Sequence, residues 1–97
     1  MTKFASAVRF RTKPDQEGAF ISDFKNRPSF DGAEIMRLVR TGDRTFLSYV
    51  EWESEEKLAA ARSGMIAFLD SFRDKLEELS PELGVTDPVS GPIIAEE

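Results

Sequence analysis

Two serine hydroxyls and one indole are the side chains of this sequence best suited to holding a small ligand. Ser6 and Ser48 each interrupt an otherwise apolar alternation, and Trp52 ends the second of these alternations. A hydroxyl in an apolar wall can orient a ligand through a hydrogen bond, and an indole can stack on an aromatic ring. Val8 lies on the same strand face as Ser6, and together these residues predict a mainly apolar ligand pocket.

The opposite wall of this pocket is expected on a helix. Met65 and Phe68 lie on one helical stripe with Phe72 and face the predicted sheet. A simpler interpretation competes for the same residues, because aromatic side chains at helical spacing usually belong to the core and Trp52 is a natural core anchor with its N–H on a carbonyl. The candidate ligand-binding residues are Ser6, Val8, Ser48, Trp52, Met65 and Phe68.

Several common chemistries are excluded by composition, because the sequence contains no His and no Cys. Nucleophilic triads and zinc sites of the usual kind both need these residues. An acidic run occurs between Glu51 and Glu56, but strand alternation and a helix start scatter its side chains, so we expect a solvated face and no metal site. No carboxylate falls on the pocket face, and no catalytic residue is assigned.

Length and charge limit the partners and the location. The 97 residues predict one domain, 1–97, and the formal net charge of −5 disfavours nucleic acid, whose phosphates require a positive surface. The sequence contains no signal peptide and no apolar run long enough to span a membrane. We therefore expect a cytoplasmic protein without a nucleic-acid or membrane partner.

The first half of the sequence alternates between strand and helix patterns. Apolar residues at every second position predict a strand over 3–12, and an apolar stripe predicts a helix over 15–27. Two further strands are predicted at 33–40 and 45–53. The short segment 41–44 contains Gly and Asp and joins them as a hairpin.

The second half predicts a helix and an edge strand. Ser54 is a good N-cap for a helix that we expect to falter at Ser63-Gly64 and then to continue to Leu79. The tail contains Pro88 and Pro92, which confine a strand to a sheet edge or a bulge. The order β-α-β-β-α-β predicts an α+β ferredoxin-like fold, a four-stranded antiparallel sheet with two helices on one face.

Apolar residues on both faces of the predicted sheet indicate a homodimer. Leu47 and Tyr49 face away from Val50 and Trp52, and a second sheet would cover them. The strand arginines are expected to pair across this dimer with Glu34, Glu51 or Glu53, and an anionic-ligand site is the alternative. These arginines are Arg9, Arg11, Arg37 and Arg40.

Two stretches of the sequence resemble the antibiotic biosynthesis monooxygenase domain. They are VRFRTKPDQEGAFISDF and GAEIMRLVRTGDRTFLSYVEWESEEKLAAARSGMIAFLDSF, with Glu51, Trp52 and Ser54 at the strand-helix hinge. The resemblance implies a dimeric α+β barrel with a ligand cavity between sheet and helices in each subunit. The haem-degrading branch uses an Asn, a Trp and a His, at positions where this sequence has Val8, Ala61 and Ser71.

Two functional classes remain open from the sequence. The first is a monooxygenase that acts on an aromatic or quinol-type small molecule without metal or flavin, since an electron-rich substrate can itself pass an electron to oxygen. The second is a non-catalytic dimeric domain of the same fold that binds a small molecule or serves as an accessory domain. The resemblance favours the first class, and the missing polar residues favour the second.

Overall fold

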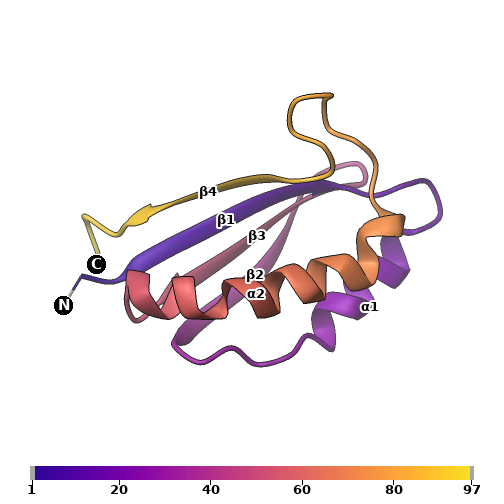
Figure 1. The fold of residues 1–97 in the computed structure, drawn as a ribbon. Coiled ribbons are helices and arrows are strands. Elements are labelled where there is room, and N and C mark those ends of the chain that lie inside the picture. The colour runs from indigo at the N-terminus through magenta and orange to yellow at the C-terminus, as the bar shows by residue number, and fades with distance from the viewer. Residues whose placement is uncertain (1, 97) are drawn as a thin grey trace.

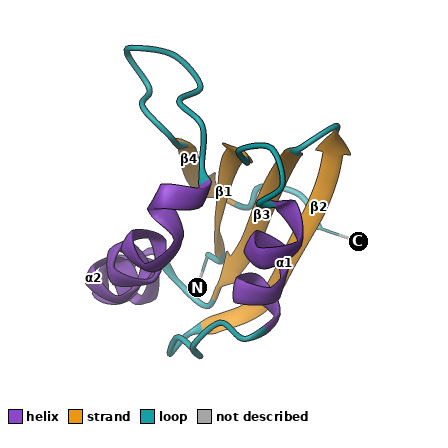
Figure 2. Cartoon of the chain, turned by 90° about the vertical axis from the view of Figure 1, so that its right-hand side faces the viewer, coloured by secondary structure: helices purple, strands orange, loops and turns teal. Residues whose placement is uncertain are grey.

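A four-stranded antiparallel sheet is the frame of the molecule. In the computed structural model, which describes residues 2–96, its strands lie in the order β2-β3-β1-β4. Both helices cover one face of the sheet, and none of the described residues forms a helix on the other face (Figure 1, Figure 2). This arrangement confirms the predicted ferredoxin-like fold. The elements are β1 (Phe4–Arg11), α1 (Glu17–Lys25), β2 (Ala33–Gly42), β3 (Thr45–Trp52), α2 (Glu55–Phe72), a 3-10 turn (Arg73–Lys75) and β4 (Asp87–Pro92).

The alternation of β3 decides which side chains face the helices. Every second residue from Phe46 to Trp52 is buried, and the residues between them are partly exposed. In the antiparallel pairing of β1 with β3, Phe4 lies opposite Trp52 and Phe10 lies opposite Phe46. The inner face predicted from the sequence is therefore confirmed for both central strands.

Aromatic residues fill one end of the space between sheet and helices. The Phe20 ring lies 5.1 Å from Phe46 and 5.4 Å from Phe72 between ring centroids, in tilted and edge-on arrangements. Such geometries are favourable because the positive edge of one ring meets the negative face of another. A second, smaller cluster of Val50, Trp52 and Leu58 occupies the opposite end.

The second helix is continuous, and the predicted break at Ser63-Gly64 is wrong. The Ser54 side chain caps its start by accepting a hydrogen bond from the Lys57 backbone N–H at 3.3 Å, as expected. A Cβ atom at Gly64 would lie 3.1 Å from the Phe30 ring. The small residue therefore serves close packing of a loop aromatic against the helix.

The second helix also ends earlier than predicted, at Phe72 instead of Leu79. Leu76 is extended and pairs with Thr12 as an isolated bridge, and it is buried although it lies outside the helix. The backbone N–H of Glu77 donates to the Arg11 carbonyl at 2.7 Å, which ties this segment to the end of β1. The chain then makes a protruding loop before it returns as β4 (Figure 1).

The last strand lies at the edge of the sheet, as Pro88 and Pro92 predicted. It pairs with β1, and Ser90 lies opposite Ser6. Within residues 2–96, the helices are too short or too polar to cross a lipid bilayer.

Three of the strand arginines form ion pairs within their own chain, and their pairing across a dimer stays a prediction. Arg9 binds Asp87 at 2.6 Å between Nη2 and Oδ2. The other two pairs are Arg11 with Glu77 and Arg40 with Glu17. The predicted partners lie elsewhere in the chain, and Glu34, for example, binds Lys3.

Candidate functional site

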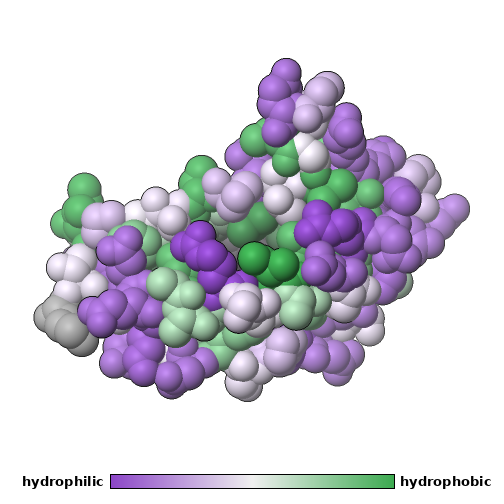
Figure 3. Space-filling model, in the orientation of Figure 1, coloured by the Kyte–Doolittle hydropathy of each residue, from purple (hydrophilic) through white to green (hydrophobic). Residues whose placement is uncertain are grey.

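A cavity of about 470 Å³ lies between the inner face of the sheet, helix α2 and the edge strand β4. Its mouth is open to solvent, since Ile66 on α2 and Val89 on β4 contribute to the wall and are 50% and 63% exposed. Figure 3 shows hydrophobic surface in a hollow between these two elements. Small and large side chains occur together on the inner face of the strands here. Ser6, Val8 and Ser48 are too small to fill the space beneath α2.

Five of the six predicted ligand-binding residues line this cavity. Ser6, Val8 and Ser48 come from the sheet, and Met65 and Phe68 come from α2. Most of the remaining wall is apolar, and it includes Phe10, Phe24, Phe30, Met36, Val50, Leu58 and Leu69. Phe72 was expected to close the cavity, but it lies in the aromatic core and is not part of the wall.

Trp52, the sixth predicted residue, lies behind the wall. Its side chain is completely buried, and its indole Nε1–H donates a hydrogen bond to the Ser6 hydroxyl oxygen at 3.0 Å. The hydrogen-bond partner is thus a side-chain hydroxyl that faces the cavity, where a carbonyl had been expected. This bond occupies one lone pair of Ser6 and leaves its own O–H free to donate into the cavity.

The hydroxyl groups of the wall follow a diagonal across three strands. Ser6 lies opposite Ser90 of β4, while Ser48 lies opposite Val8 on the other side of β1. Ser6 and Ser48 are therefore diagonal neighbours on one face, a distance of roughly 7–8 Å in antiparallel sheets. The sequence did not point to Ser90, although its place between Pro88 and Pro92 on an alternating strand offered a signal.

Arg62 is a second polar wall residue that the sequence pattern did not predict. It projects from α2 at the cavity mouth and is exposed. The helical pattern alone indicates an ordinary surface arginine at position 62. Only the position of β4 beside α2 makes Arg62 part of a cavity wall. Thr86, just before β4, also contributes to the wall.

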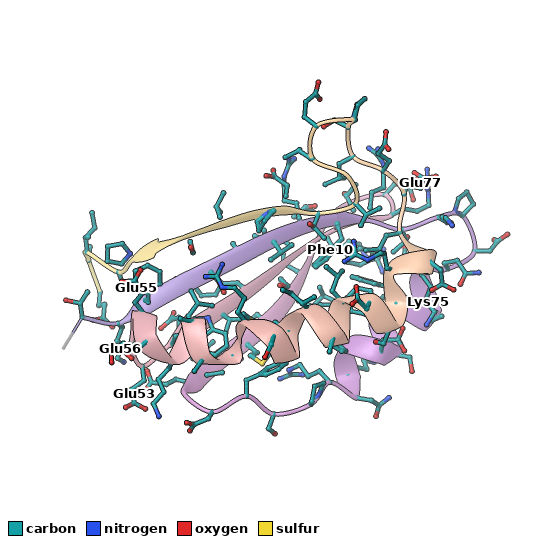
Figure 4. All side chains as sticks on the ribbon, viewed as in Figure 1. Phe10, Glu53, Glu55, Glu56, Lys75 and Glu77 are labelled. Atoms are coloured by element: carbon teal, nitrogen blue, oxygen red, sulfur yellow. The ribbon has the colours of Figure 1, made fainter. Side chains whose placement is uncertain are left out.

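Among residues 2–96, no Asp, Glu or Tyr contributes to the wall of the main cavity. Tyr49 is on the opposite face of the sheet, where its O–H donates to a Glu51 carboxylate oxygen at 3.0 Å. That hydrogen bond raises the pKa of Tyr49 above its ordinary value, with smaller effects from burial and from nearby carboxylates. Glu53, Glu55 and Glu56 gather at the periphery around the start of α2 (Figure 4). Within residues 2–96, no cluster of acidic side chains could hold a metal ion.

A second hollow of about 240 Å³ opens on the other side of the same wall, between α1 and β2. The two hollows share Phe24, Met36, Ser48 and Val50 as wall residues. The charged residues that border the second hollow are Lys25, Arg27 and Arg37. Arg37 lies opposite Tyr49 of β3, so it belongs to the outer face of the sheet. The space between sheet and helices is therefore accessible from both sides.

Comparisons with solved structures identify the fold. A protein of unknown function from Nitrosomonas europaea, NE2512, is 22% identical, with a TM-score of 0.77 over 100% of this chain and 94% of its own. A candidate antibiotic biosynthesis monooxygenase from Chloroflexus aurantiacus is 13% identical, with a TM-score of 0.74 over 98% and 96%. A dimeric ferredoxin-like protein from an uncultured marine organism is 12% identical, with a TM-score of 0.72 over 100% and 92%.

No protein-family model matches the sequence, and the search of curated proteins returned no match. The resemblance to antibiotic biosynthesis monooxygenases is confirmed at the level of the fold, because several structures of that description share it across nearly the whole chain.

Proposed function

We propose that residues 1–97 form a single antibiotic biosynthesis monooxygenase-like domain that oxidises an aromatic or quinol-type small molecule without metal or flavin. The observation that carries this proposal is the cavity of about 470 Å³ between the sheet and α2. Ligand pockets typically measure roughly 300–1,000 Å³ and combine apolar walls with a few polar groups. This cavity meets both conditions, with serine hydroxyls set in an aliphatic and aromatic wall.

The proposed reaction needs little from the protein beyond a shaped apolar site. An electron-rich ring activates a CH₂ group, which loses two hydrogens and gains one oxygen atom from O₂, while the second oxygen atom leaves as water. The substrate supplies all four electrons, so the equation balances without another reductant. The protein excludes bulk water, orients the substrate through Ser6 and Ser48, and stabilises the phenolate form that reacts with oxygen.

A non-catalytic binding protein is the second candidate, and the chemistry of the wall favours it. The residues that line the main cavity between positions 2 and 96 include no carboxylate and no tyrosine. The Arg62 guanidinium group donates hydrogen bonds and does not accept them, so it supplies no base. A substrate would therefore have to lose its proton to water, whereas simple binding needs no base at all.

Oxygen consumption with anthrones, which carry the CH₂ group that the proposed reaction oxidises, distinguishes the two candidates. We expect the wild-type protein to accelerate oxygen uptake, and Ser48→Val to lower that rate because it removes a wall hydroxyl. Ser29→Val is the matched control, since Ser29 is exposed and lies outside both hollows. Uptake at the uncatalysed rate, together with saturable binding of the same compounds, would establish the binding protein.

We further propose that the protein is a cytoplasmic homodimer, with itself as its macromolecular partner. The outer face of the sheet carries Ile35, Val39, Leu47 and Tyr49, all partly or largely exposed in a single chain. A neighbour of the same fold is described as dimeric, which supports a dimer. Light scattering at micromolar concentration should give twice the chain mass of 10.9 kDa, and the single-chain mass would contradict the dimer.

A further inference from the structure

The charged residues that line the two hollows are all basic. Arg62 lines the main cavity, and Lys25, Arg27 and Arg37 line the second hollow. No Asp or Glu among residues 2–96 contributes to either wall. The chain as a whole has 18 acidic and 13 basic residues, so its composition alone would favour acidic side chains at these positions.

These four cations also differ from the others in their partners. Eight basic residues form ion pairs with carboxylates of the same chain, namely Lys3, Arg9, Arg11, Arg40, Arg44, Lys57, Arg73 and Lys75. Within residues 2–96, no carboxylate forms an ion pair with any of the four cations that line the hollows. Lys13 is likewise unpaired in this range, and it lies outside both hollows.

Neutral acceptors hold two of these cations in place. Arg27 donates from Nε to the Met36 sulfur at 3.2 Å and from Nη1 to the Phe24 carbonyl at 3.1 Å. Arg37 donates to the Met36 carbonyl at 3.2 Å. These bonds orient the guanidinium groups without neutralising their charge. An orientation of this kind leaves the positive charge available to a ligand.

We propose that the cavity binds an organic anion, with its apolar ring system against the cavity wall and its carboxylate, sulfonate or phenolate group paired with Arg62. This inference rests on the proposed ligand site and adds the charge of the ligand. The net charge of −5 does not oppose it, because screening at physiological salt reduces charge interactions beyond about 8 Å. A direct ion pair with Arg62 acts at short range, and no carboxylate of residues 2–96 already occupies that guanidinium.

Two dyes that differ by one sulfonate test this proposal. Anilinonaphthalene sulfonate and N-phenylnaphthylamine share the same ring system, and only the first is an anion. Fluorescence titration should show that Arg62→Gln weakens the sulfonate about fivefold, the effect of one partly exposed ion pair, and leaves the neutral dye unchanged. Lys13→Gln is the matched control, because it also removes one unpaired cation but lies away from the hollows, and it should change neither dissociation constant.

The location of the dyes is tested with Met65→Trp, which places a larger side chain in the wall of the main cavity. This variant should weaken both dyes while circular dichroism shows an intact fold. Unchanged dye binding by this variant would place the dyes elsewhere and overturn the proposal.

The remaining outcomes separate the two proposals. Equal losses for the two dyes in Arg62→Gln, or equal losses of the sulfonate in Arg62→Gln and Lys13→Gln, would overturn the anion preference while the ligand site stands. Failure of the wild-type protein to bind either dye would overturn both the anion preference and the proposed ligand site.

Discussion

Replacing Trp52 by alanine should remove a large part of the folding stability. The side chain is completely buried, and it packs with Val50 and Leu58 in the smaller core cluster. Burial of a tryptophan removes roughly 200–250 Å² from water, which corresponds to about 5–6 kcal/mol at about 25 cal/mol per Å². Alanine retains part of this area, so the expected loss is about 3–5 kcal/mol, the usual cost of such a truncation.

Urea unfolding followed by far-UV circular dichroism measures this loss without relying on the fluorescence of the only tryptophan. With a urea dependence of about 1.5 kcal/mol/M, a loss of 4 kcal/mol lowers the midpoint by about 2–3 M. Wild type and variant must be compared at one protein concentration, because dimer formation adds to the apparent stability. Coincident unfolding midpoints would refute the assignment of Trp52 as a core anchor.

The hydrogen bond from Trp52 to Ser6 is tested separately by a double-mutant cycle. Trp52→Phe keeps an aromatic ring but removes the Nε1–H donor, and Ser6→Ala removes the acceptor at 3.0 Å. The losses of unfolding free energy in the two single variants should add up to more than the loss in the double variant, and the difference should be about 1 kcal/mol. A coupling near zero would show that the indole does not hold Ser6 in place, and the role of Trp52 in orienting the cavity hydroxyl would then be lost.

Three further predictions concern the sheet faces and the core. Spectrophotometric titration of Tyr49, the only tyrosine, should give a pKa above the ordinary value of 10.0, and Glu51→Gln should lower that pKa, because the Glu51 carboxylate accepts a hydrogen bond from the neutral phenol. Because the folded state favours the neutral phenol, this hydrogen bond makes the folding stability depend on pH. Its contribution is complete below the pKa of Tyr49 in the unfolded chain and disappears as the pH rises through the pKa of Tyr49 in the folded chain. Thr12→Val should raise the urea midpoint by an amount equivalent to about 1 kcal/mol, since the buried Thr12 hydroxyl has no hydrogen-bond partner among residues 2–96; a lower midpoint would contradict this. Leu47→Glu should give the 10.9 kDa mass of a single chain in light scattering while Ala59→Glu, on the exposed side of α2, keeps twice that mass; a dimer in both variants would place the interface elsewhere.

Local patterns were sufficient to predict the sheet but not the end of the second helix. The strict alternation from Phe46 to Trp52 determines which side chains of β3 face inward, and two prolines determine that the last strand lies at the edge. Leu76 continues the helical spacing of Phe72, yet it reaches the core from an extended segment that pairs with Thr12. The spacing of apolar residues predicts that a residue is buried. It does not distinguish a helix from an extended segment when both would bury that residue.

Strand alternation and helical spacing predict the part of the cavity wall made by the central strands and by Met65 and Phe68, and they miss the part made by Arg62 and β4. Ser6 and Ser48 lie on the two central strands, whose neighbourhood follows from the topology. Arg62 and Ser90 border the same cavity although the protruding loop separates them along the sequence. They do so because α2 and β4 lie on two sides of the cavity. The sequence contains no local signal for that arrangement.

The size of the cavity argues that it is occupied by water or a ligand. A dry enclosed cavity costs roughly 24 cal/mol per Å³, so about 470 Å³ would cost about 11 kcal/mol, as much as the whole stability of a typical domain. The open mouth and the hydroxyls of Ser6, Ser48 and Ser90 remove this cost by admitting and binding water. A ligand that replaces this water binds the folded state alone, and at a hundred times its dissociation constant it adds about 2.7 kcal/mol of stability. Ligand binding can therefore convert this unfilled space into additional stability of the folded state.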